Sequence, residues 1–568
     1  MQGKKMHSSV HHRWQWGKLF ILLAAFSIGL FTALHSTIFS AATSFDDCST
    51  SISRIVTCDQ EAVSLSINRI VAYFNNRGSL YQERGVAGIF WYDERFDVAI
   101  PPTVVYDHGL WILGKMDGVF RAAVVQWGSS YSPGPIIDGK PAKVLSSDSS
   151  RYRPYKITYG DCAETNRDYA EWPSDLGAPV DEKRAPRLFG NQTVWMVYNG
   201  ADSTANGDAF REPFSRIPVE VHQLAFARAA SANSQTDLLS NVIFLEWTLI
   251  NKGDRLIDST YVSLWSDLDF SNPSNNVPGV DTTLQLGYLW EGLVKGGDGN
   301  PPARAVGYVW LYGPHIPSPG DTAVYRGKKI SNHRNLPITS FWGIIDDSGN
   351  EWAFTTPAYS MTAAWNLARG LDKRGNPIMD STANRTTRFP YSGDPVTGAG
   401  WYYNWPYRGG GSGFNLFSGP FILAPNDTQW VMAALVPAIG QDRFDAIVKL
   451  RDRAAALRSM PYDSLIQFAA PDSGLIIDST SAQVVLGDNY PNPFSNSTTI
   501  EFTLNEQTHS VLQVFDLLGR CVATLIDKDS EAGEFEITFN AHDLPSGVYL
   551  YRLRTMRSSV SKKFVLLR

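Results

Sequence analysis

The clearest strand signal in the sequence is Val242-Ile243-Phe244-Leu245-Glu246-Trp247-Thr248-Leu249-Ile250. β-Branched and aromatic residues dominate it, as they do in buried strands. A second such segment, Tyr261-Val262-Ser263-Leu264-Trp265, follows the polar turn Asn251-Lys252-Gly253-Asp254. The two segments predict neighbouring strands, joined either as a β-hairpin or as partners in the two sheets of a sandwich.

Short β-rich runs separated by turn residues extend on both sides of this pair. Asp117-Gly118 predicts a tight hairpin turn, because both residues tolerate the positive φ of a type I′ turn. The other predicted strands have the spacing typical of sandwiches: 104–106, 110–113, 120–125, 283–290, 305–312, 341–345, 414–423 and 429–436. We therefore expect a mostly β protein, with a large multi-sandwich body of two packed β units.

One helix is predicted, at residues 442–460. Phe444, Ile447, Leu450 and Leu457 recur there near a 3.6-residue period, with charged residues between them. We expect this helix to cap or close the large β body.

Composition supports this fold class and limits the partners. Hydrophobic residues make up 43% and charged residues 19%, as in globular proteins, and 46 Gly with 32 Pro favour strands punctuated by turns. A formal net charge of -6 provides no basic field for phosphates, so we expect no nucleic-acid partner.

The first 42 residues have the order of a secretory signal peptide. Four basic residues precede the apolar run Leu19–Leu34, and the small residues Ser40-Ala41-Ala42 follow it. An uncleaved membrane anchor is the competing interpretation, because the run approaches spanning length. Cys48 and Cys58 are close enough to form a disulfide after export, with unpaired buried thiols as the alternative.

The chain divides into five segments. We predict a signal peptide at 1–42, an irregular lead-in at 43–85, the β-rich body at 86–470, a linker at 471–486 and a separate unit at 487–568. The linker prediction rests on the loss of aromatic residues and the rise of Asp, Ser and Thr.

The last segment carries four motif blocks in order. They are Gly487–Phe502, with Tyr490-Pro491-Asn492-Pro493-Phe494 at its centre, Val514–Arg520, Leu544–Arg552 and Lys562–Arg568. Together they closely resemble the C-terminal sorting domain of the type IX (Por) secretion system. The two prolines cannot donate ladder hydrogen bonds, so we expect them outside the sheet, with Tyr490 and Phe494 inserted at its edge.

This resemblance implies a route and a destination. The protein would cross the inner membrane by the general route and the outer membrane through the type IX machinery. It would then be linked to surface lipopolysaccharide or released, often after loss of the tail. We expect a small seven-strand sandwich, with glycines at turns that need backbone freedom. Its sorting residues would be Tyr490, Pro491, Asn492, Pro493, Phe494, Gly519, Gly547, Tyr549, Lys562 and Lys563.

The body shows a weaker resemblance. Blocks such as Leu110–Gly118 and Ser418–Phe421 resemble a group of secreted proteins that carry the same tail, over most of residues 60–460. Such a likeness implies an architecture and no mechanism.

The common hydrolase, zinc and nucleotide-binding motifs are absent from the sequence, which does not by itself exclude an activity. It has no Gly-x-Ser-x-Gly elbow, His-Glu-x-x-His, Walker loop or Cys-x-x-Cys pair. His108, His222, His315 and His333 lack ligand spacing. We therefore expect a non-enzymatic body that acts in binding, adhesion or envelope structure. The alternative is a secreted hydrolase acting on polysaccharide or protein.

Two candidate sites remain in the body. Asp267, Asp269 and Asp281 surround a loop rich in Asn, Ser and Pro, and their oxygens predict either a Ca²⁺ site or a solvated loop of Asx turns. Trp401, Tyr403 and Trp405 precede three glycines. Their rings either stack on a glycan or fold back onto the sheet.

Overall fold

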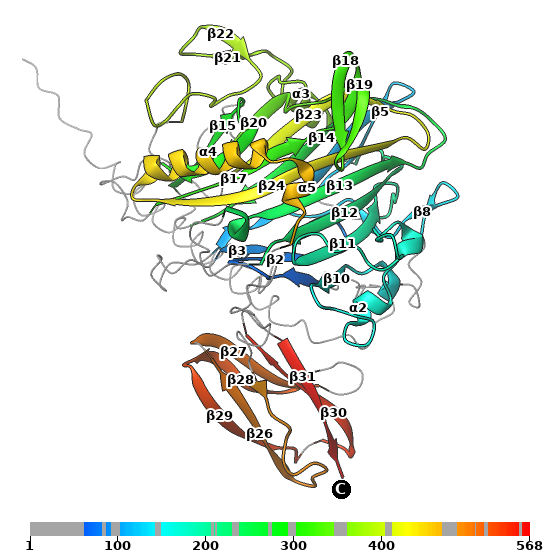
Figure 1. The fold of residues 1–568 in the computed structure, drawn as a ribbon, viewed down its shortest axis with the longest axis vertical. Coiled ribbons are helices and arrows are strands. Elements are labelled where there is room, and N and C mark those ends of the chain that lie inside the picture. The colour runs from blue at the N-terminus through cyan, green and yellow to red at the C-terminus, as the bar shows by residue number, and fades with distance from the viewer. Residues whose placement is uncertain are drawn as a thin grey trace, which may run out of the picture. The chain divides into compact units, whose positions relative to one another are not determined.

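The computed structural model describes residues 62–81, 87–91, 103–142, 149–205, 210, 213–229, 238–270, 275–292, 303–345, 360–403, 412–468, 485–505, 507–515, 521–542, 544–555 and 559–567. Two compact units contain them, one within Thr57–Ile476 and one within Ile477–Arg568. Strands dominate both units, so the predicted mostly β class is confirmed (Figure 1). The predicted signal peptide, the Cys48–Cys58 pair and most of the predicted linker lie outside the described residues.

A nine-stranded antiparallel sheet forms the centre of the larger unit, the body. Its order is β10-β11-β12-β13-β24-β17-β16-β15, with β7 beside β11. The strands are β7 (Ser132–Pro133), β10 (Tyr155–Thr158), β11 (Gln192–Asn199), β12 (Val219–Ala227), β13 (Ile243–Asn251), β15 (Asn276–Asp281), β16 (Leu286–Glu291), β17 (Ala303–Tyr312) and β24 (Thr428–Gly440).

A five-stranded sheet, in the order β20-β23-β14-β5-β6, packs on one face of the large sheet. Its strands are β5 (Asp107–Met116), β6 (Val119–Ala123), β14 (Ile257–Leu268), β20 (Ser340–Ile345) and β23 (Ser412–Leu423). Side chains of both sheets share one apolar core, which includes Trp247 of β13 and Leu264 of β14. This arrangement is a sandwich.

The two segments that open the sequence argument therefore lie in different sheets. β13 pairs with β12 and β24, whereas β14 pairs with β5 and β23. Of the two alternatives, the sandwich pair is the observed one. Both faces of β13 are covered, because Trp247 faces the inter-sheet core and Phe244 faces the opposite core. That double burial explains its nearly continuous apolar sequence.

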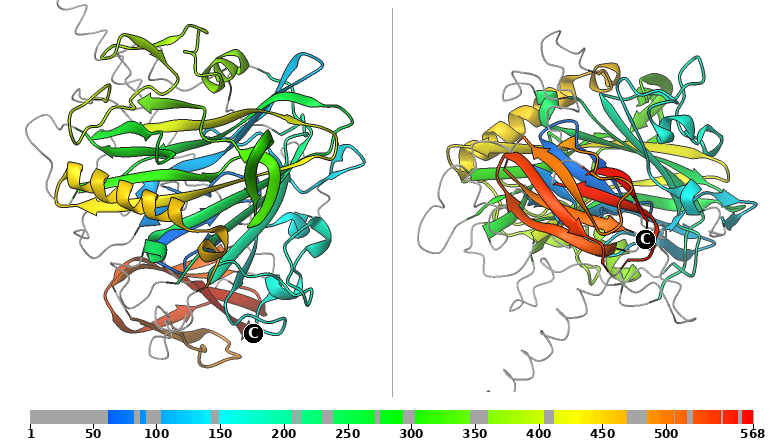
Figure 2. Two further views of the ribbon diagram at one scale, coloured as in Figure 1. Left: turned by 45° about the horizontal axis from the view of Figure 1, so that its top comes forward. Right: turned by 90° about the horizontal axis from the view of Figure 1, so that it is seen from below.

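The opposite face of the large sheet is covered by α4 (Arg443–Ser459), the yellow helix in Figure 2. Asp442 caps it by accepting the N–H groups of Phe444 (2.8 Å) and Asp445 (2.9 Å). Its apolar side, including Ile447 and Leu450, packs on β24, β17 and β16. The structure thus places the predicted closing helix within one residue of the predicted bounds at each end.

Smaller elements decorate the sandwich. The hairpins are β8 (Ile136–Ile137) with β9 (Lys140–Pro141), β18 (His315–Tyr325) with β19 (Lys328–Asn335), and β21 (Ile378–Asp380) with β22 (Arg385–Thr387). The remaining helices are η1 (Ser149–Tyr152), α2 (Arg167–Ala170), η2 (Ser174–Leu176), η3 (Leu238–Asn241), α3 (Met361–Ala368) and α5 (Tyr462–Leu465).

Asp117 and Gly118 join β5 to β6 with φ of 51° and 77°, as predicted for a type I′ turn. No helix in the described ranges is long and apolar enough to span a membrane.

The lead-in prediction needs correction. Within the predicted irregular segment 43–85, the structure describes residues 62–81, and these contain β1 (Val63–Leu65) and β2 (Ile70–Phe74). They form a four-stranded sheet with β3 (Ile89–Trp91) and β4 (Thr103–Val105). Four of the five β2 residues are buried, so the polar alternation that marks a half-exposed strand is missing.

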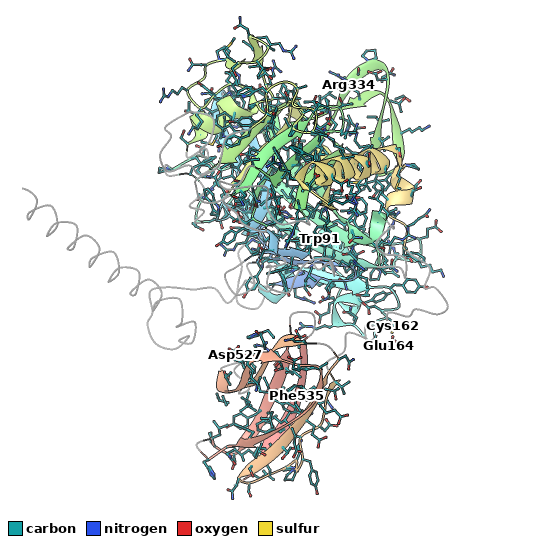
Figure 3. The ribbon with its side chains drawn as sticks, turned by 90° about the vertical axis from the view of Figure 1, so that its left-hand side faces the viewer. Trp91, Cys162, Glu164, Arg334, Asp527 and Phe535 are labelled. Atoms are coloured by element: carbon teal, nitrogen blue, oxygen red, sulfur yellow. The ribbon has the colours of Figure 1, made fainter. Side chains whose placement is uncertain are left out.

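The smaller unit, the tail, is a sandwich of seven strands among its described residues, as predicted. One sheet has β25 (Val485–Leu486), β26 (Ser497–Leu504) and β29 (Gly533–Asn540). The other has β27 (Thr508–Phe515), β28 (Cys521–Ser530), β30 (Gly547–Arg554) and β31 (Ser559–Leu566). The stacked rings of Phe502 and Phe535, 4.9 Å apart, join β26 to β29; Phe535 is labelled in Figure 3. β25 extends the unit two residues before the predicted start at Gly487.

Candidate functional site

The tail site is the loop before β26 that carries the two prolines. Its backbone leaves the sheet except at single residues: Tyr490 exchanges two 2.9 Å hydrogen bonds with Thr499. Phe494 inserts into the tail core and is 5% exposed, as predicted. The prediction that Tyr490 inserts at the edge is wrong, because its backbone pairing directs the ring outward and leaves it 82% exposed.

Hydrogen bonds attach this loop to the last strand, β31. The Phe494 N–H donates to the Val565 carbonyl at 3.1 Å, and the Leu567 N–H donates to the Phe494 carbonyl at 2.8 Å. The Val565 N–H donates to Oδ1 of Asn492 at 2.9 Å. Lys562 forms an ion pair with Asp488 at 2.7 Å. The start of the tail is therefore held by its end.

Three other predicted sorting residues lie nearby. The Tyr549 hydroxyl donates to the Pro545 carbonyl at 2.8 Å, and Lys563 is exposed. The expectation that Gly547 needs glycine's backbone freedom is wrong: its φ lies outside the left-handed region, and an added Cβ would meet only the Tyr549 ring, at 3.7 Å. Gly519 lies outside the described residues.

A buried polar network supports the loop from below. The Tyr551 hydroxyl accepts the Asn489 N–H at 3.0 Å and donates to the Gly487 carbonyl at 2.9 Å. The Asn489 amide donates to Thr498 at 2.9 Å. Because buried polar groups must be paired, this network fixes the backbone that leads into the prolines.

Replacing Tyr551 by phenylalanine should therefore destabilise the tail. The substitution leaves the buried Asn489 N–H and the partly buried Gly487 carbonyl without their partner, which costs about 1–3 kcal/mol of unfolding free energy. Urea unfolding of the full chain, monitored through a probe in the tail, measures this loss of stability. Tyr490→Phe is the matched control, because its exposed hydroxyl should contribute nothing. Equal stability of the two variants would contradict the assigned role of Tyr551.

In the body, two of the three aspartates of the calcium hypothesis, Asp267 and Asp281, have separate partners. Asp267 accepts the Nε1–H of Trp127 at 2.6 Å. Asp281 accepts two N–H groups of its own Asx turn and lies 3.4 Å from Arg451. Burial raises the pKa of Asp269 to about 6. No group of three or more His, Cys, Asp and Glu residues suited to a metal ion occurs in the part of the chain that the structure describes. The calcium site stays a prediction.

The aromatic loop folds back at its described rings. Trp401 and Tyr403 are half-buried and pack against the buried Tyr391, with ring centroids 5.3 Å and 5.9 Å away. This geometry favours the packing alternative over an exposed glycan platform for these two residues. Trp405 lies outside the described residues.

Two neighbouring buried groups on β5, Asp107 and His108, depart strongly from ordinary protonation behaviour. Burial raises the pKa of Asp107 to about 7, although the N–H groups of Leu80 (3.0 Å) and His108 (2.8 Å) oppose the shift. Burial lowers the pKa of His108 to about 3, and its Nδ1 lies 2.5 Å from the Tyr308 hydroxyl. Asp107 and His108 are 3% and 1% exposed, which makes the pair part of the core and closes it to substrates.

The shifted pKa values of Asp107 and His108 predict how the stability of the body depends on pH. The folded chain holds a proton on Asp107 up to pH about 7, so its contribution to stability falls as the pH rises above the ordinary aspartate pKa. His108 contributes the opposite slope from pH about 3 up to its ordinary pKa of 6.5. In Asp107→Asn only the second slope remains. Between pH 4 and 6.5, the unfolding free energy of Asp107→Asn minus that of the parent should therefore rise by about 1.4 kcal/mol per pH unit. Parallel pH profiles, measured by urea unfolding, would contradict the shift.

A buried carboxylate lies on the outer face of β13. Glu246 is fully buried and accepts hydrogen bonds from Nε of Arg326 (3.0 Å), Nε1 of Trp430 (3.0 Å) and the hydroxyl of Tyr462 (2.8 Å). One carboxylate thus joins β13 to β24, α5 and the turn between β18 and β19. A lone glutamate inside an apolar strand was the sequence signal for this site.

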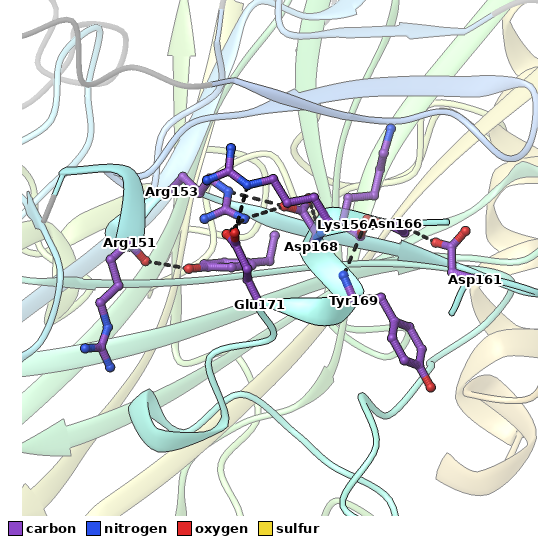
Figure 4. Close-up of polar contacts among 10 residues, drawn as sticks. Arg151, Arg153, Lys156, Asp161, Asn166, Asp168, Tyr169 and Glu171 are labelled. Carbon is purple, nitrogen blue, oxygen red and sulfur yellow. Dashed lines mark hydrogen bonds and ion pairs between the residues drawn. The ribbon is translucent and has the colours of Figure 1, made fainter. Parts of the chain in front are cut away.

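Arg153 shows how the body neutralises a buried cation. Its guanidinium donates to Asp168 at 2.7 Å and Glu171 at 3.0 Å, and it lies over the Tyr155 ring at 4.0 Å (Figure 4). Asp168 also accepts the Lys156 N–H at 2.9 Å. This network anchors α2 to β10, and two carboxylates neutralise the Arg153 guanidinium.

A pocket of about 530 Å³ opens beside α3 and the β21–β22 hairpin. Its polar lining is Tyr261, Thr339, Arg369, Thr386, Thr387 and Arg388. In the described part of the chain, neither Arg369 nor Arg388 forms an ion pair. A second pocket, of about 340 Å³, is lined by mostly apolar side chains with Gln285, Asn335 and Arg458. Neither lining contains a carboxylate, imidazole or thiol.

Comparison with known proteins concerns mainly the tail. No curated protein matches the chain. Among solved structures, a polysaccharide lyase is 10% identical, with a TM-score of 0.17 over 61% of this chain and 34% of that chain. Dimeric latent PorU from Porphyromonas gingivalis is 12% identical, with a TM-score of 0.14 over 67% and 32%. The chain thus spans about a third of each structure, and neither likeness bears on the body.

The tail matches a sequence family. Residues 488–567 match the family described as the secretion system C-terminal sorting domain. The match covers the proline loop and reaches the last strand, the two parts that hydrogen bonds join. Such a tail indicates a type IX secreted protein, which interacts with that machinery and is exported to the cell surface or beyond. Residues 488–567 are a C-terminal sorting domain of the type IX secretion system.

Proposed function

We propose that the body is a non-catalytic binding protein that the tail carries out of the cell. The observation that supports it is the lining of the two pockets described above, which offers arginines, hydroxyls and apolar surface. Hydrolysis of glycosides ordinarily requires two carboxylates at the bond, and peptide hydrolysis requires an activated nucleophile or a metal-bound water. Arginines and hydroxyls serve to hold a ligand instead.

The finer details of export belong to the same proposal. Residues 1–42 act as a cleaved signal peptide, and the protein reaches the periplasm before the tail engages the type IX machinery. The mature protein is then linked to surface lipopolysaccharide or released. A shift in mass after lipopolysaccharide-deficient growth tests the linkage, and N-terminal sequencing of the exported protein tests the cleavage.

A glycan and peptide array tests the binding function. The full chain, purified from the host, should bind one class of arrayed glycan without altering it. Release of product from any arrayed substrate, followed by mass spectrometry, would replace the binding function with the hydrolase alternative. A parallel array with EDTA tests the calcium prediction, because a calcium-dependent ligand would be lost.

A further inference from the structure

The pocket between α3 and the β21–β22 hairpin is built by an irregularity in the five-stranded sheet. The pairing of β14 shifts register between Ile257 and Thr260 on the β23 side, and Ser259 has a φ of 48°. Such bulges re-aim side chains. A second shift follows between Thr260 and Val262, and Tyr261, which lies within it, lines the pocket. Opposite it, Gly419 allows close approach: an added Cβ would lie 2.6 Å from the Tyr261 ring.

Two arginines enter the pocket from rigid backbone. Arg369 is the C-cap of α3, where its N–H donates to the Asn366 carbonyl at 3.1 Å. The Arg388 carbonyl accepts the Phe341 N–H at 3.0 Å. The Arg388 stem lies against Gly370, where an added Cβ would be 2.4 Å from its Cγ. These contacts hold the backbone of Arg369 and Arg388 beside the same pocket, so both cations lie at its mouth.

The positive charges of Arg369 and Arg388 both act on the hydroxyl group of Tyr261. Burial raises the pKa of the Tyr261 hydroxyl, and the charges of Arg369 and Arg388 both oppose that shift. Unlike Arg153, which carboxylates enclose, these two guanidinium groups have no ion pair within the described ranges, and both are exposed. Two such cations over a hydroxyl-lined pocket attract an oxyanion, because a guanidinium matches carboxylate and sulfate geometry.

The pocket also has room and chemistry for more than the anion. At about 530 Å³ it is in the size range of small-molecule sites. The lining includes Tyr261, which is largely buried and carries an aromatic ring and a hydroxyl, and the hydroxyl-bearing Thr386 and Thr387. Ring faces and hydroxyl groups suit a polyhydroxylated sugar ring better than an extended peptide.

We propose that this pocket binds an acidic saccharide, with Arg369 and Arg388 holding its carboxylate or sulfate group. The proposal rests on the binding function proposed above and adds the ligand class and the site. Tyr261 and the threonines orient the ring, and the two arginines select the charged form over its neutral counterpart.

Calorimetric titration of the full chain tests this proposal. The probes are cellobiouronic acid, the neutral cellobiose, inorganic sulfate and the peptide acetyl-Asp-Glu-amide. The acidic disaccharide should bind, and cellobiose should bind about tenfold more weakly or worse. Arg369→Gln and Arg388→Gln should each weaken the acidic disaccharide by about tenfold or more. Arg388→Lys should restore only part of the loss, because lysine lacks the bidentate fork.

Arg385→Gln is the matched control, because Arg385 is exposed on the same hairpin and does not line the pocket. An equal loss in this variant would overturn the pocket in favour of general charge attraction. Three results would each overturn the acidic saccharide as the ligand class. They are sulfate binding as tightly as the acidic disaccharide, the peptide binding more tightly than it, and no binding of the acidic disaccharide. Turnover of the bound disaccharide would overturn the binding function while leaving Arg369 and Arg388 as its anion site.

Discussion

Replacing Glu246 by alanine is expected to lower the free energy of unfolding of the body by about 3–5 kcal/mol. The substitution removes the carboxylate that three donors on the outer face of β13 share: Arg326, Trp430 and Tyr462. It leaves a desolvated cation, two unpaired donors and a cavity. Each of these is costly in a packed interior.

Thermal and urea unfolding of the full chain measure this effect, with intrinsic tryptophan fluorescence as the readout because Trp430 is at the site. Glu246→Gln should cost less, about 1.5–3 kcal/mol, since one acceptor oxygen and the shape remain. Arg167→Ala is the control, because its ion pair with Glu171 is at the surface and should contribute under about 0.5 kcal/mol. A loss below about 1 kcal/mol in Glu246→Ala would show that water replaces the carboxylate.

Removal of the tail is expected to abolish export. A chain truncated before Val485 loses all seven strands of the sorting domain, including the β25 residues that the sequence placed in the linker. The body should then accumulate in the periplasm of the native host, with none above background on intact cells. Protease accessibility of whole cells, together with fractionation, measures the distribution.

Two controls make the truncation decisive. The periplasmic body should unfold at the same urea concentration as in the full chain, which separates failed export from misfolding. Asn492→Ala breaks the side-chain contact with Val565 and keeps the sandwich core, so partial export is expected. Surface display of the truncated chain would contradict the role of the tail.

The sequence predicted secondary structure best in a strand that is buried on both faces and in a long helix. Val242–Ile250 predicted β13, and the 3.6-residue pattern predicted α4 within one residue at each end. It failed at β2, where burial of four of five residues removed the alternation that separates a strand from a buried loop. It left the hairpin or sandwich choice open, because pairing partners such as β24 are distant in sequence.

The candidate sites show the same division. Local motifs located the proline loop, whose contacts lie within the tail. The pocket was missed because Arg369 and Arg388 come from a helix end and a hairpin strand, with no spacing that marks them as neighbours. Only the fold brings them together. Tyr490 was placed wrongly since an aromatic residue beside proline gives no sign of which face its ring takes.

The attachment of the proline loop to β31 links the two ends of the sorting domain. Asn492 and Phe494 obtain their partners from Val565 and Leu567, at the far end of the domain. A chain that stops before this strand would present the motif residues without the conformation that the machinery meets. The conformation of the proline loop therefore depends on residues at the opposite end of the domain's sequence.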